Sequence, residues 1–279
     1  MVDQLIALAL AEDIGDGDHS ALSCVPEHAR GKAKLLVKDN GVIAGVELAK
    51  RIFEQYDSEL SIHIIKQDGE KVKNEDIVFE IEGKSRSILA TERLVLNFMQ
   101  RMSAIATKTN EYVEIVKGTH AKILDTRKTT PGLRQIEKWA VRIGGGQNHR
   151  MGLYDMIMIN DNHIDYAGGI KQAIEEANRY IKENNLSLKI EIEARDEKEL
   201  DEIIAVGKVD RIMLDNFSPE KIIEVLPKIP KHFETEASGN ITKDTLRSYA
   251  ETGVDFISSG ALTHSIQSLD LSLKAIYLK

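Results

Sequence analysis

Short apolar runs alternate with amphipathic stretches through the second half of the chain. The apolar runs lie at residues 121–124, 156–159, 188–192, 211–214, 233–237 and 256–258. Helical patterns fill most of the intervals between them, at residues 132–141, 167–183, 197–206, 219–226 and 242–251. Strands that alternate with helices are typical of parallel strands joined by crossover connections. About six or seven such units in succession predict a β/α barrel.

The first half of the chain has a different pattern. Short alternating or apolar runs at residues 33–37, 42–44, 61–66 and 77–81 are separated by turn signals, and a helix is predicted among them at 46–56. This arrangement favours an antiparallel α+β domain. Residues 85–118 carry apolar side chains at helical spacing and predict one long helix, in which the small residues at 103–107 are a candidate break or kink.

Composition narrows the classes of function. The chain has 279 residues and a formal net charge of −8, so we expect neither a nucleic-acid partner nor an anionic membrane surface, both of which require broad basic surfaces. Cys24 is the only cysteine, which is compatible with a reducing, cytoplasmic environment. The apolar stretch at residues 5–11 is too short to cross a bilayer and lacks the charged start of a signal peptide.

One basic segment stands out in this acidic chain. Residues 125–163 are rich in basic side chains and contain a run of three glycines at 144–146. A local cationic cluster set among glycines is typical of a site for a small polyanion. The glycines end a predicted helix and no G-x-G-x-x-G motif follows a strand, so a dinucleotide-binding fold is not supported. The basic residues that we take as the candidate cluster are Arg127, Lys128, Arg142, His149 and Arg150.

Polar residues stand at or near the end of every predicted barrel strand. In a β/α barrel the carboxyl ends of the strands line the active site, so six such ends in succession predict one site with both signs of charge. In chain order they are Asp125; Asn160, Asp161, Asn162 and His163; Glu191 and Glu193; Asp215 and Asn216; Glu236, Ser238, Gly239 and Asn240; and Ser258, Ser259 and Gly260.

The last two of these strand ends share a small Ser-Gly turn before a predicted helix. Backbone N–H groups at such a turn make a phosphate cradle, and glycine lets a phosphate approach closely. Glu193 and Asp215 are predicted at neighbouring strand ends, where paired carboxylates hold Mg²⁺ through water or accept hydrogen bonds from sugar hydroxyls. A glycosidase pair is disfavoured because neutral sugars do not need the surrounding cations. This inventory suits a phosphoribosyl donor and an anionic acceptor.

Other metal sites are weaker interpretations. The loop EDIGDGDH at residues 12–19 lacks the spacing and terminal glutamate of a calcium-binding EF-hand, so a turn or a lid over the substrate is favoured. His149 and His163 match no common zinc motif, and no cysteine assists them.

Seven segments, taken in order and spacing, identify a resemblance to the quinolinate phosphoribosyltransferase family. They are DTRKTTPGLR, IGGGQNHRMGLYD, DNHI, EIEARD, MLDN, EASGNI and SSGALTHS, and EDIGDGD and ATERLVLNFMQRMSAIAT before them are also similar. The resemblance covers nearly the whole chain. It implies an N-terminal α/β sandwich domain at residues 1–104 and an incomplete, seven-stranded β/α barrel at 105–279, with residues 266–279 packing back on the first domain. It also implies a homodimer or higher homo-oligomer with shared active sites.

The resemblance further implies the reaction and its residues. Phosphoribosyl pyrophosphate and quinolinate would give nicotinate mononucleotide, pyrophosphate and CO₂ in NAD biosynthesis, with Mg²⁺ as cofactor. Lys128, Glu193 and Asp215 would be catalytic, and the two acids would also hold the ribose hydroxyls and Mg²⁺, through water or substrate. The remaining substrate-binding positions would be Arg93 from the partner subunit, Arg127, His149, Arg150, Asn160, and, at the 5′-phosphate, Ser238, Gly239, Asn240, Ser259, Gly260 and Ala261.

Two positions depart from the family pattern. Asn160 stands where the family has a pocket lysine, which removes a charge-assisted contact. Asn240 replaces the second glycine of a Ser-Gly-Gly turn, where asparagine tolerates the left-handed backbone. Because of Asn160, two alternatives stay open: a related phosphoribosyltransferase with another acceptor, such as the molybdenum-transport-associated relatives, or a weakened form that only binds its ligands.

Overall fold

The computed structural model describes residues 1–276, which form two compact units. Unit 1 comprises residues 1–110 and 130–145 and the described residues from Leu262 onward, and unit 2 comprises residues 111–129 and 146–261. No helix of the described residues is both long and apolar enough to cross a membrane.

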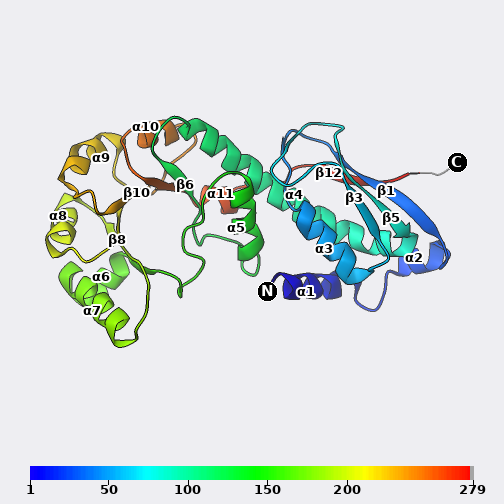
Figure 1. Cartoon of the computed structure of the whole chain (residues 1–279), viewed down its shortest axis with the longest axis horizontal. Helices are drawn as coiled ribbons and strands as arrows, with labels where there is room; N and C mark the ends of the chain where they lie inside the picture. The colour runs from blue at the N-terminus through cyan, green and yellow to red at the C-terminus, as the bar shows by residue number, and fades with distance from the viewer. Residues whose placement is uncertain (277–279) are drawn as a thin grey trace. The chain divides into compact units, whose positions relative to one another are not determined.

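Unit 1 is built on an antiparallel sheet in the order β12-β1-β5-β3 (Figure 1). The strands are β1 (Arg30–Val37), β3 (Ser61–Ile64), β5 (Ile77–Lys84) and β12 (Leu271–Ile276), and β2 (Gly41–Val42) and β4 (Lys71–Val72) form a separate ribbon. Alternate side chains of β1 are buried, as the period-two pattern predicted. The C-terminal β12 pairs along β1, and residues 277–279 of the segment expected to pack on this domain lie outside the described residues.

The helices of unit 1 include one very long element. They are α1 (Val2–Ile14), α2 (His19–Cys24), α3 (Val46–Tyr56), the part of α4 (Ser85–Val116) up to Asn110, and α5 (Arg134–Ile143). Asp18, in the loop considered for calcium, accepts a hydrogen bond from Ala21 N and caps α2. The small residues of α4 do not break it, so the predicted break is wrong. Instead, Ser103 Oγ bonds both N and O of Ala44, which lets the chain after β2 approach the helix.

Close packing also explains the first glycine of the 144–146 run. Gly144 caps the C-terminus of α5, and a Cβ on it would lie 2.4 Å from Ala106 O and 2.7 Å from Thr109 Cβ. These distances are shorter than carbon atoms tolerate, so this glycine lets α5 lie against α4. Gly145 follows with φ at 92°. Both observations give the run a structural reason in addition to the predicted anion site.

Unit 2 contains a six-stranded parallel sheet in the order β6-β11-β10-β9-β8-β7 (Figure 1). Its strands are β6 (Lys122–Leu124), β7 (Ile157–Ile159), β8 (Ile190–Ala194), β9 (Arg211–Asp215), β10 (Glu234–Ser238) and β11 (Phe256–Ser258). All six coincide with predicted apolar runs. A parallel bridge between Leu124 and Gln147 stands where a seventh strand would pair, beyond β6. The resemblance implied seven strands, and the described residues contain six strands and this bridge.

The helices of unit 2 lie along the outside of this curved sheet (Figure 1). They are α6 (Asp161–Ala167), α7 (Ile170–Glu183), α8 (Glu197–Val206), α9 (Pro219–Val225), the 3₁₀ turn η1 (Leu226–Lys228) and α10 (Leu246–Ala250). The helix predicted at 167–183 is found as α7 but begins only at Ile170, because Gly168 and Gly169, both at positive φ, separate it from α6. The helix predicted at 242–251 is shorter than expected.

Candidate active site

Strand register brings the acidic and polar residues of unit 2 onto one face of the sheet. Glu193 of β8 pairs with Met213 of β9, and Asp215 of β9 pairs with Ser238 of β10. Residues paired in register point to the same face, and alternate residues of a strand share that face. Glu193, Asp215 and Ser238 therefore face the same side near the carboxyl ends of three adjacent strands, as the sequence predicted.

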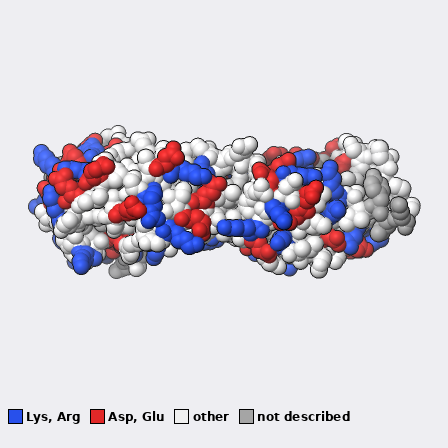
Figure 2. All heavy atoms as spheres, turned by 90° about the horizontal axis from the view of Figure 1, so that it is seen from above, with Lys and Arg blue, Asp and Glu red and all other residues white. Residues whose placement is uncertain are grey.

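Three basic side chains follow β6 or precede β7. Arg127 is half-buried, and its Nε has no hydrogen-bond partner among the described residues. Burial, together with the nearby charge of Arg127, lowers the pKa of Arg150. Lys128 is exposed, and its charge acts on Asp215. An unsatisfied buried N–H beside a second guanidinium suits an anion that supplies the missing acceptor. On the face shown in Figure 2 basic and acidic side chains are interspersed, with no broad basic patch there.

The carboxylates at the same end of the sheet repel one another. Burial raises the pKa of Glu193 to about 7, and Asp215 and Asp161 add to the shift. Burial also raises the pKa of Asp215, with Asp161 acting in the same direction. Three acids in mutual repulsion attract a cation, and oxygen ligands suit a hard ion such as Mg²⁺. Asp161, already predicted among the polar residues at the end of the second strand, thus joins the predicted pair.

The loop after β10 is held in an unusual backbone conformation. A Cβ on Gly239 would lie 2.2 Å from Asn216 Oδ1, so only glycine fits there. Asn240 has φ at 50°, the left-handed conformation expected at this position, and its Nδ2 donates to Asn216 Oδ1 at 3.0 Å. The helix predicted from residue 242 begins only at Leu246, so it does not follow this turn directly. The second turn does precede a helix, since α11 (Ala261–His264) begins after Ser259 and Gly260.

Asn160 has a structural task that the sequence interpretation missed. It is the N-cap of α6, where its side chain accepts from His163 N and its own N–H donates to His163 Nδ1, both at 3.2 Å. Such a reciprocal pair satisfies two N–H groups at the start of a helix. The Asn-x-x-His spacing was the available signal. His163 Nδ1 is therefore occupied by this cap.

Arg93 and Arg101 lie on the part of α4 that belongs to unit 1. Arg93 is exposed, and no hydrogen bond or ion pair of its guanidinium is found among the described residues. Arg101, further along the same helix, has structural partners. It contacts the buried Glu137 at 2.6 Å and donates to Thr130 Oγ1 at 2.7 Å. The available guanidinium on this helix is therefore that of Arg93.

A charged cluster lies inside the barrel. Glu191 and Glu236, predicted at strand ends, are fully buried within β8 and β10 instead. Arg211, which the sequence interpretation missed, pairs in register with Glu191 and donates to Glu236 Oε2 at 2.9 Å. His149 Nε2 lies 2.8 Å from Glu191 Oε2 and 3.6 Å from Glu236 Oε2. The sequence did contain a signal for Arg211. It lies an even number of residues before Asp215 in the same strand, so both side chains are on the same face of the sheet.

The same cluster has donor atoms of the kind that bind metals. Ligand atoms of His149, Glu191 and Glu236 lie within 4.8 Å of one another. Arg211 already supplies a positive charge to Glu236 at hydrogen-bond distance, so the cluster has a cation of its own. Burial raises the pKa of both Glu191 and Glu236 to about 7, which reduces the negative charge further. The guanidinium of Arg211 and the raised pKa values therefore compensate part of the buried charge, while both oxygens of Glu191 have no hydrogen-bond partner among the described residues.

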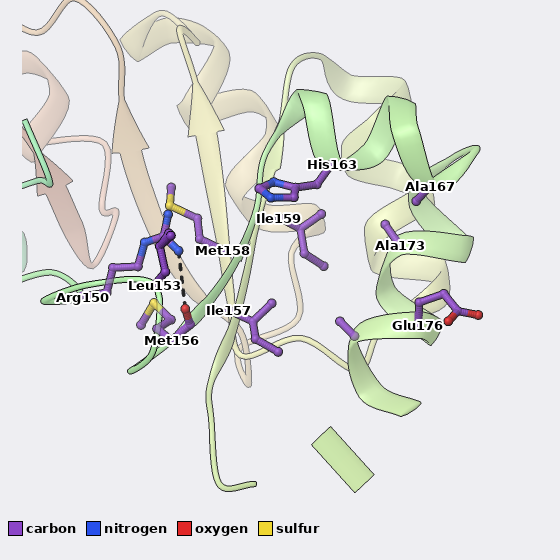
Figure 3. Close-up of a pocket in the computed structure, with 11 residues that line it drawn as sticks. Arg150, Leu153, Met156, Ile157, Met158, Ile159, His163, Ala167, Ala173 and Glu176 are labelled. Atoms are coloured by element: carbon purple, nitrogen blue, oxygen red, sulfur yellow. Dashed lines mark hydrogen bonds between the residues drawn. The ribbon is translucent and has the colours of Figure 1, made fainter. Parts of the chain in front are cut away.

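A pocket of about 450 Å³ runs along β7 (Figure 3). Its walls are mostly apolar side chains of β7, α6 and α7, and Arg150 and His163 are among its polar lining residues. Arg150 Nη1 makes a long contact of 3.5 Å with Met156 O there. The pocket does not include Glu193, Asp215 or Ser238, so it adjoins the strand-end site only through Arg150 and His163.

The buried acid Glu236 gives a test through the pH dependence of stability. Burial and the neighbouring Glu191 raise its pKa from 4.5 to about 7, so the folded protein holds a proton that the unfolded chain has released. The stability gained from that proton is fully present below pH 4.5 and is lost as the pH rises through about 7. Glu236→Gln cannot titrate. Its free energy of unfolding relative to wild type should therefore rise by on the order of 3 kcal/mol from about pH 5 to about pH 8, in urea titrations.

The matched control is Glu234→Gln, which changes another partner of Arg211 at a half-exposed position of the same strand. Its stability difference from wild type should stay nearly constant over the same range. Parallel pH curves for wild type and Glu236→Gln would contradict this account of the cluster.

Comparisons with known proteins agree with this geometry. The description "Quinolinate phosphoribosyl transferase, N-terminal domain" matches residues 18–103, and its C-terminal counterpart matches residues 105–274. The chain is 44% identical to quinolinate phosphoribosyltransferase [decarboxylating] 1b of Nicotiana tabacum, over 97% of this chain and 81% of that protein. It is 43% identical to a probable nicotinate-nucleotide pyrophosphorylase [carboxylating] of Bacillus subtilis, over 94% of this chain and 89% of the relative.

Solved structures give the same result. NadC from Streptococcus pyogenes superposes with a TM-score of 0.94 and 40% identity, covering 100% of this chain and 97% of that one. The nicotinate-nucleotide pyrophosphorylase of Francisella tularensis superposes with a TM-score of 0.89 and 38% identity, covering 99% and 96%. The six predicted strands, the polar residues at their carboxyl ends and these similarities together show that the chain belongs to the quinolinate phosphoribosyltransferase family.

Proposed function

We propose that this chain transfers the phosphoribosyl group of phosphoribosyl pyrophosphate to quinolinate, with loss of CO₂. The products are nicotinate mononucleotide, pyrophosphate and CO₂, in the route to NAD. One observation carries the proposal. Two partly buried guanidiniums, one with an unsatisfied N–H, lie near carboxylates that repel one another, in a chain of this family. A doubly anionic acceptor and a sugar that becomes positively charged require both.

The cations bind the anionic groups. Arg127 and Arg150 hold the carboxylates of quinolinate, because a guanidinium matches a carboxylate with two parallel hydrogen bonds. Lys128 acts on the same side and reaches the pyrophosphate, while its charge also balances Asp215. Ser238, Gly239 and Asn240, with Ser259, Gly260 and Ala261, hold the 5′-phosphate through backbone N–H groups and hydroxyls.

The acids serve the ribose. Glu193 and Asp215 accept hydrogen bonds from its hydroxyls and stabilise the oxocarbenium character that C1 of the ribose develops as pyrophosphate leaves. The same two side chains hold Mg²⁺ in this proposal, through water or substrate, and the mutual repulsion of the acids fits such an ion. When bound, Mg²⁺ neutralises the charge of the leaving pyrophosphate.

The rest of the reaction requires orientation more than a protein nucleophile. The pyridine nitrogen of quinolinate attacks C1 of the ribose, and the C–O bond to pyrophosphate breaks. The alkylated ring is then an electron sink, so the adjacent carboxylate leaves as CO₂ and the ring carbon takes up a proton. Held at the correct distance and angle, the two substrates react without further covalent catalysis.

Asn160 supports a second candidate. Its side chain carries no charge and is used in the cap of α6, which leaves the pocket with one cation fewer than the family pattern. The alternatives are a phosphoribosyltransferase with a different acceptor, and a weakened protein that binds the ligands without turnover.

The assembly proposed is a homodimer or larger homo-oligomer in which Arg93 enters the partner's site. The exposed Arg93, without a partner among the described residues, supports this role. A cytoplasmic location is proposed from the single cysteine of the chain. Related plant proteins carry names with chloroplastic and mitochondrial locations.

A direct assay tests the function. The chain is incubated with phosphoribosyl pyrophosphate and Mg²⁺, with quinolinate or nicotinate as acceptor, and CO₂ and mononucleotide are measured. We expect turnover of quinolinate with equal amounts of both products. Turnover of nicotinate alone, without CO₂, would favour the other acceptor class. Tight binding of quinolinate with no product would favour the binding form.

Position 160 offers a trade-off between stability and affinity. Asn160→Lys removes the cap acceptor and should lower the free energy of unfolding by about 1 kcal/mol. It adds a cation near the pocket and should lower the KM for quinolinate by about tenfold. Asn160→Asp is the matched control, because it keeps a cap acceptor with the opposite charge. It should retain stability and raise that KM, in calorimetry and steady-state kinetics. Equal KM values for both variants would oppose a pocket role for this position.

Shared active sites predict complementation. Arg93→Ala and Lys128→Ala are each expected to be nearly inactive, because each removes an anion contact worth about 1.5–3 kcal/mol. In a mixed dimer one site would then contain both intact residues. Mixing the two variants after mild dissociation should recover about a quarter to a half of the wild-type activity in subunit exchange. Confirmed mixed dimers without recovered activity would place Arg93 and Lys128 in the same subunit's site or outside it.

A further inference from the structure

His149 is held on every side by the protein. Its backbone N–H donates to Asp125 Oδ1 at 2.9 Å, and Asp125 is fully buried at the end of β6. Its ring is 6% exposed and lies inside the barrel of unit 2. The residue directly after it is Arg150, which the proposed function assigns to quinolinate. The orientation of His149 therefore bears on the orientation of Arg150.

The backbone fixes which ring nitrogen carries the proton. The N–H of Arg150 donates to His149 Nδ1 at 2.7 Å. A backbone N–H is always a donor, so Nδ1 must be the acceptor and the ring proton must be on Nε2. A proton on Nδ1 would face the N–H of Arg150 and break this contact.

The Nε2 proton faces two carboxylates of the barrel interior. Glu191 Oε2 lies 2.8 Å from Nε2 and Glu236 Oε2 lies 3.6 Å away. The contact with Glu191 is close but is not a hydrogen bond, so the two acids act on the ring through their charge. Glu236 accepts a hydrogen bond from Arg211. Glu191 is the carboxylate closer to His149.

We infer that Glu191 is a positioning residue for the reaction: it holds His149 in the Nε2–H form, and His149 in turn fixes the backbone that presents Arg150 to the acceptor. This inference rests on the proposed function for its kinetic consequence. Nδ1 of His149 accepts from the backbone and its ring is almost fully buried, so its contribution to binding passes through Arg150. Such a buried acceptor behind a histidine fixes both the tautomer and the ring orientation.

The effect should be specific to one substrate. Arg150 lies beside β7 at one end of the apolar pocket, while the phosphate turns follow β10 and β11 (Figure 3). A shift of Arg150 would therefore weaken binding of the quinolinate carboxylates and leave the phosphoribosyl end unchanged. General loss of structure would weaken both.

Three variants test the inference. Glu191→Leu removes the carboxylate at similar volume, and Glu191→Gln keeps a side-chain oxygen without the charge. Glu234→Gln is the control, because it changes the other carboxylate that Arg211 contacts. For Glu191→Leu we expect the KM for quinolinate to rise about tenfold and the KM for phosphoribosyl pyrophosphate to stay within about twofold. Glu191→Gln should restore the quinolinate KM to within about threefold of wild type, and Glu234→Gln should resemble wild type.

A spectroscopic measurement makes the test independent of turnover. Nitrogen–proton correlation spectra of histidine-labelled protein, with His149→Asn to assign the signal, should show the Nε2–H form in wild type and in Glu191→Gln. An Nδ1–H ring in the wild type would overturn the inference, as would folded Glu191→Leu with an unchanged quinolinate KM. An equal rise of both KM values would reduce Glu191 to a structural role. If wild type does not turn over quinolinate, the proposed function fails, while the ring signal still decides how His149 is held.

Discussion

The barrel interior of unit 2 depends on balancing charge away from water. Glu191, Glu236 and Asp125 are fully buried, and a buried carboxylate is costly unless hydrogen bonds or an opposite charge compensate it. The protein uses a different compensation for each. Arg211 pairs with Glu236, the ring proton of His149 faces Glu191, and the backbone N–H of His149 donates to Asp125. Raised pKa values of Glu191 and Glu236 reduce the remaining charge. An apolar filling would avoid these costs, so the cluster points to a need for orientation.

That orientation connects the interior to the reactive end of the sheet. The segment that contains His149 and Arg150 has a single bridge, between Leu124 and Gln147, to tie it to the sheet. Without a full strand, its position has to come from side chains. Asp125 and Glu191 provide this from β6 and β8, on either side of the interior. The cationic part of the site is therefore supported by buried acids, and the acidic part, at Glu193 and Asp215, is supported directly by regular strands.

This difference explains what the sequence could predict. Strands β6 to β11 fall on short runs that alternate with helical patterns, and polar residues stand at or near their ends, so the fold and the acids Glu193 and Asp215 were accessible. The sequence could not predict how deeply each residue of a strand is buried. Glu191 and Glu193 are two residues apart and share a face, and only packing distinguishes the buried residue from the one near the carboxyl end. Arg211 was missed for the same reason. Asn160 was interpreted only as an absent charge, because its cap with His163 requires knowledge of where α6 begins.

The two tasks of Asn160 oppose each other physically. At the N-terminus of α6, a side chain must be short and must accept a hydrogen bond to satisfy His163 N. In an anion pocket a long cation is favoured, and a cation beside the positive end of a helix is itself disfavoured. An asparagine satisfies the helix and leaves anion binding to Arg127 and Arg150. These two guanidiniums lie close enough for the charge of one to lower the pKa of the other, so a further cation would add to the same repulsion until the dicarboxylate binds. The uncharged residue therefore reduces the electrostatic repulsion among cations in the pocket before the acceptor binds. Binding of the acceptor then depends more on Arg150, whose backbone is positioned by His149.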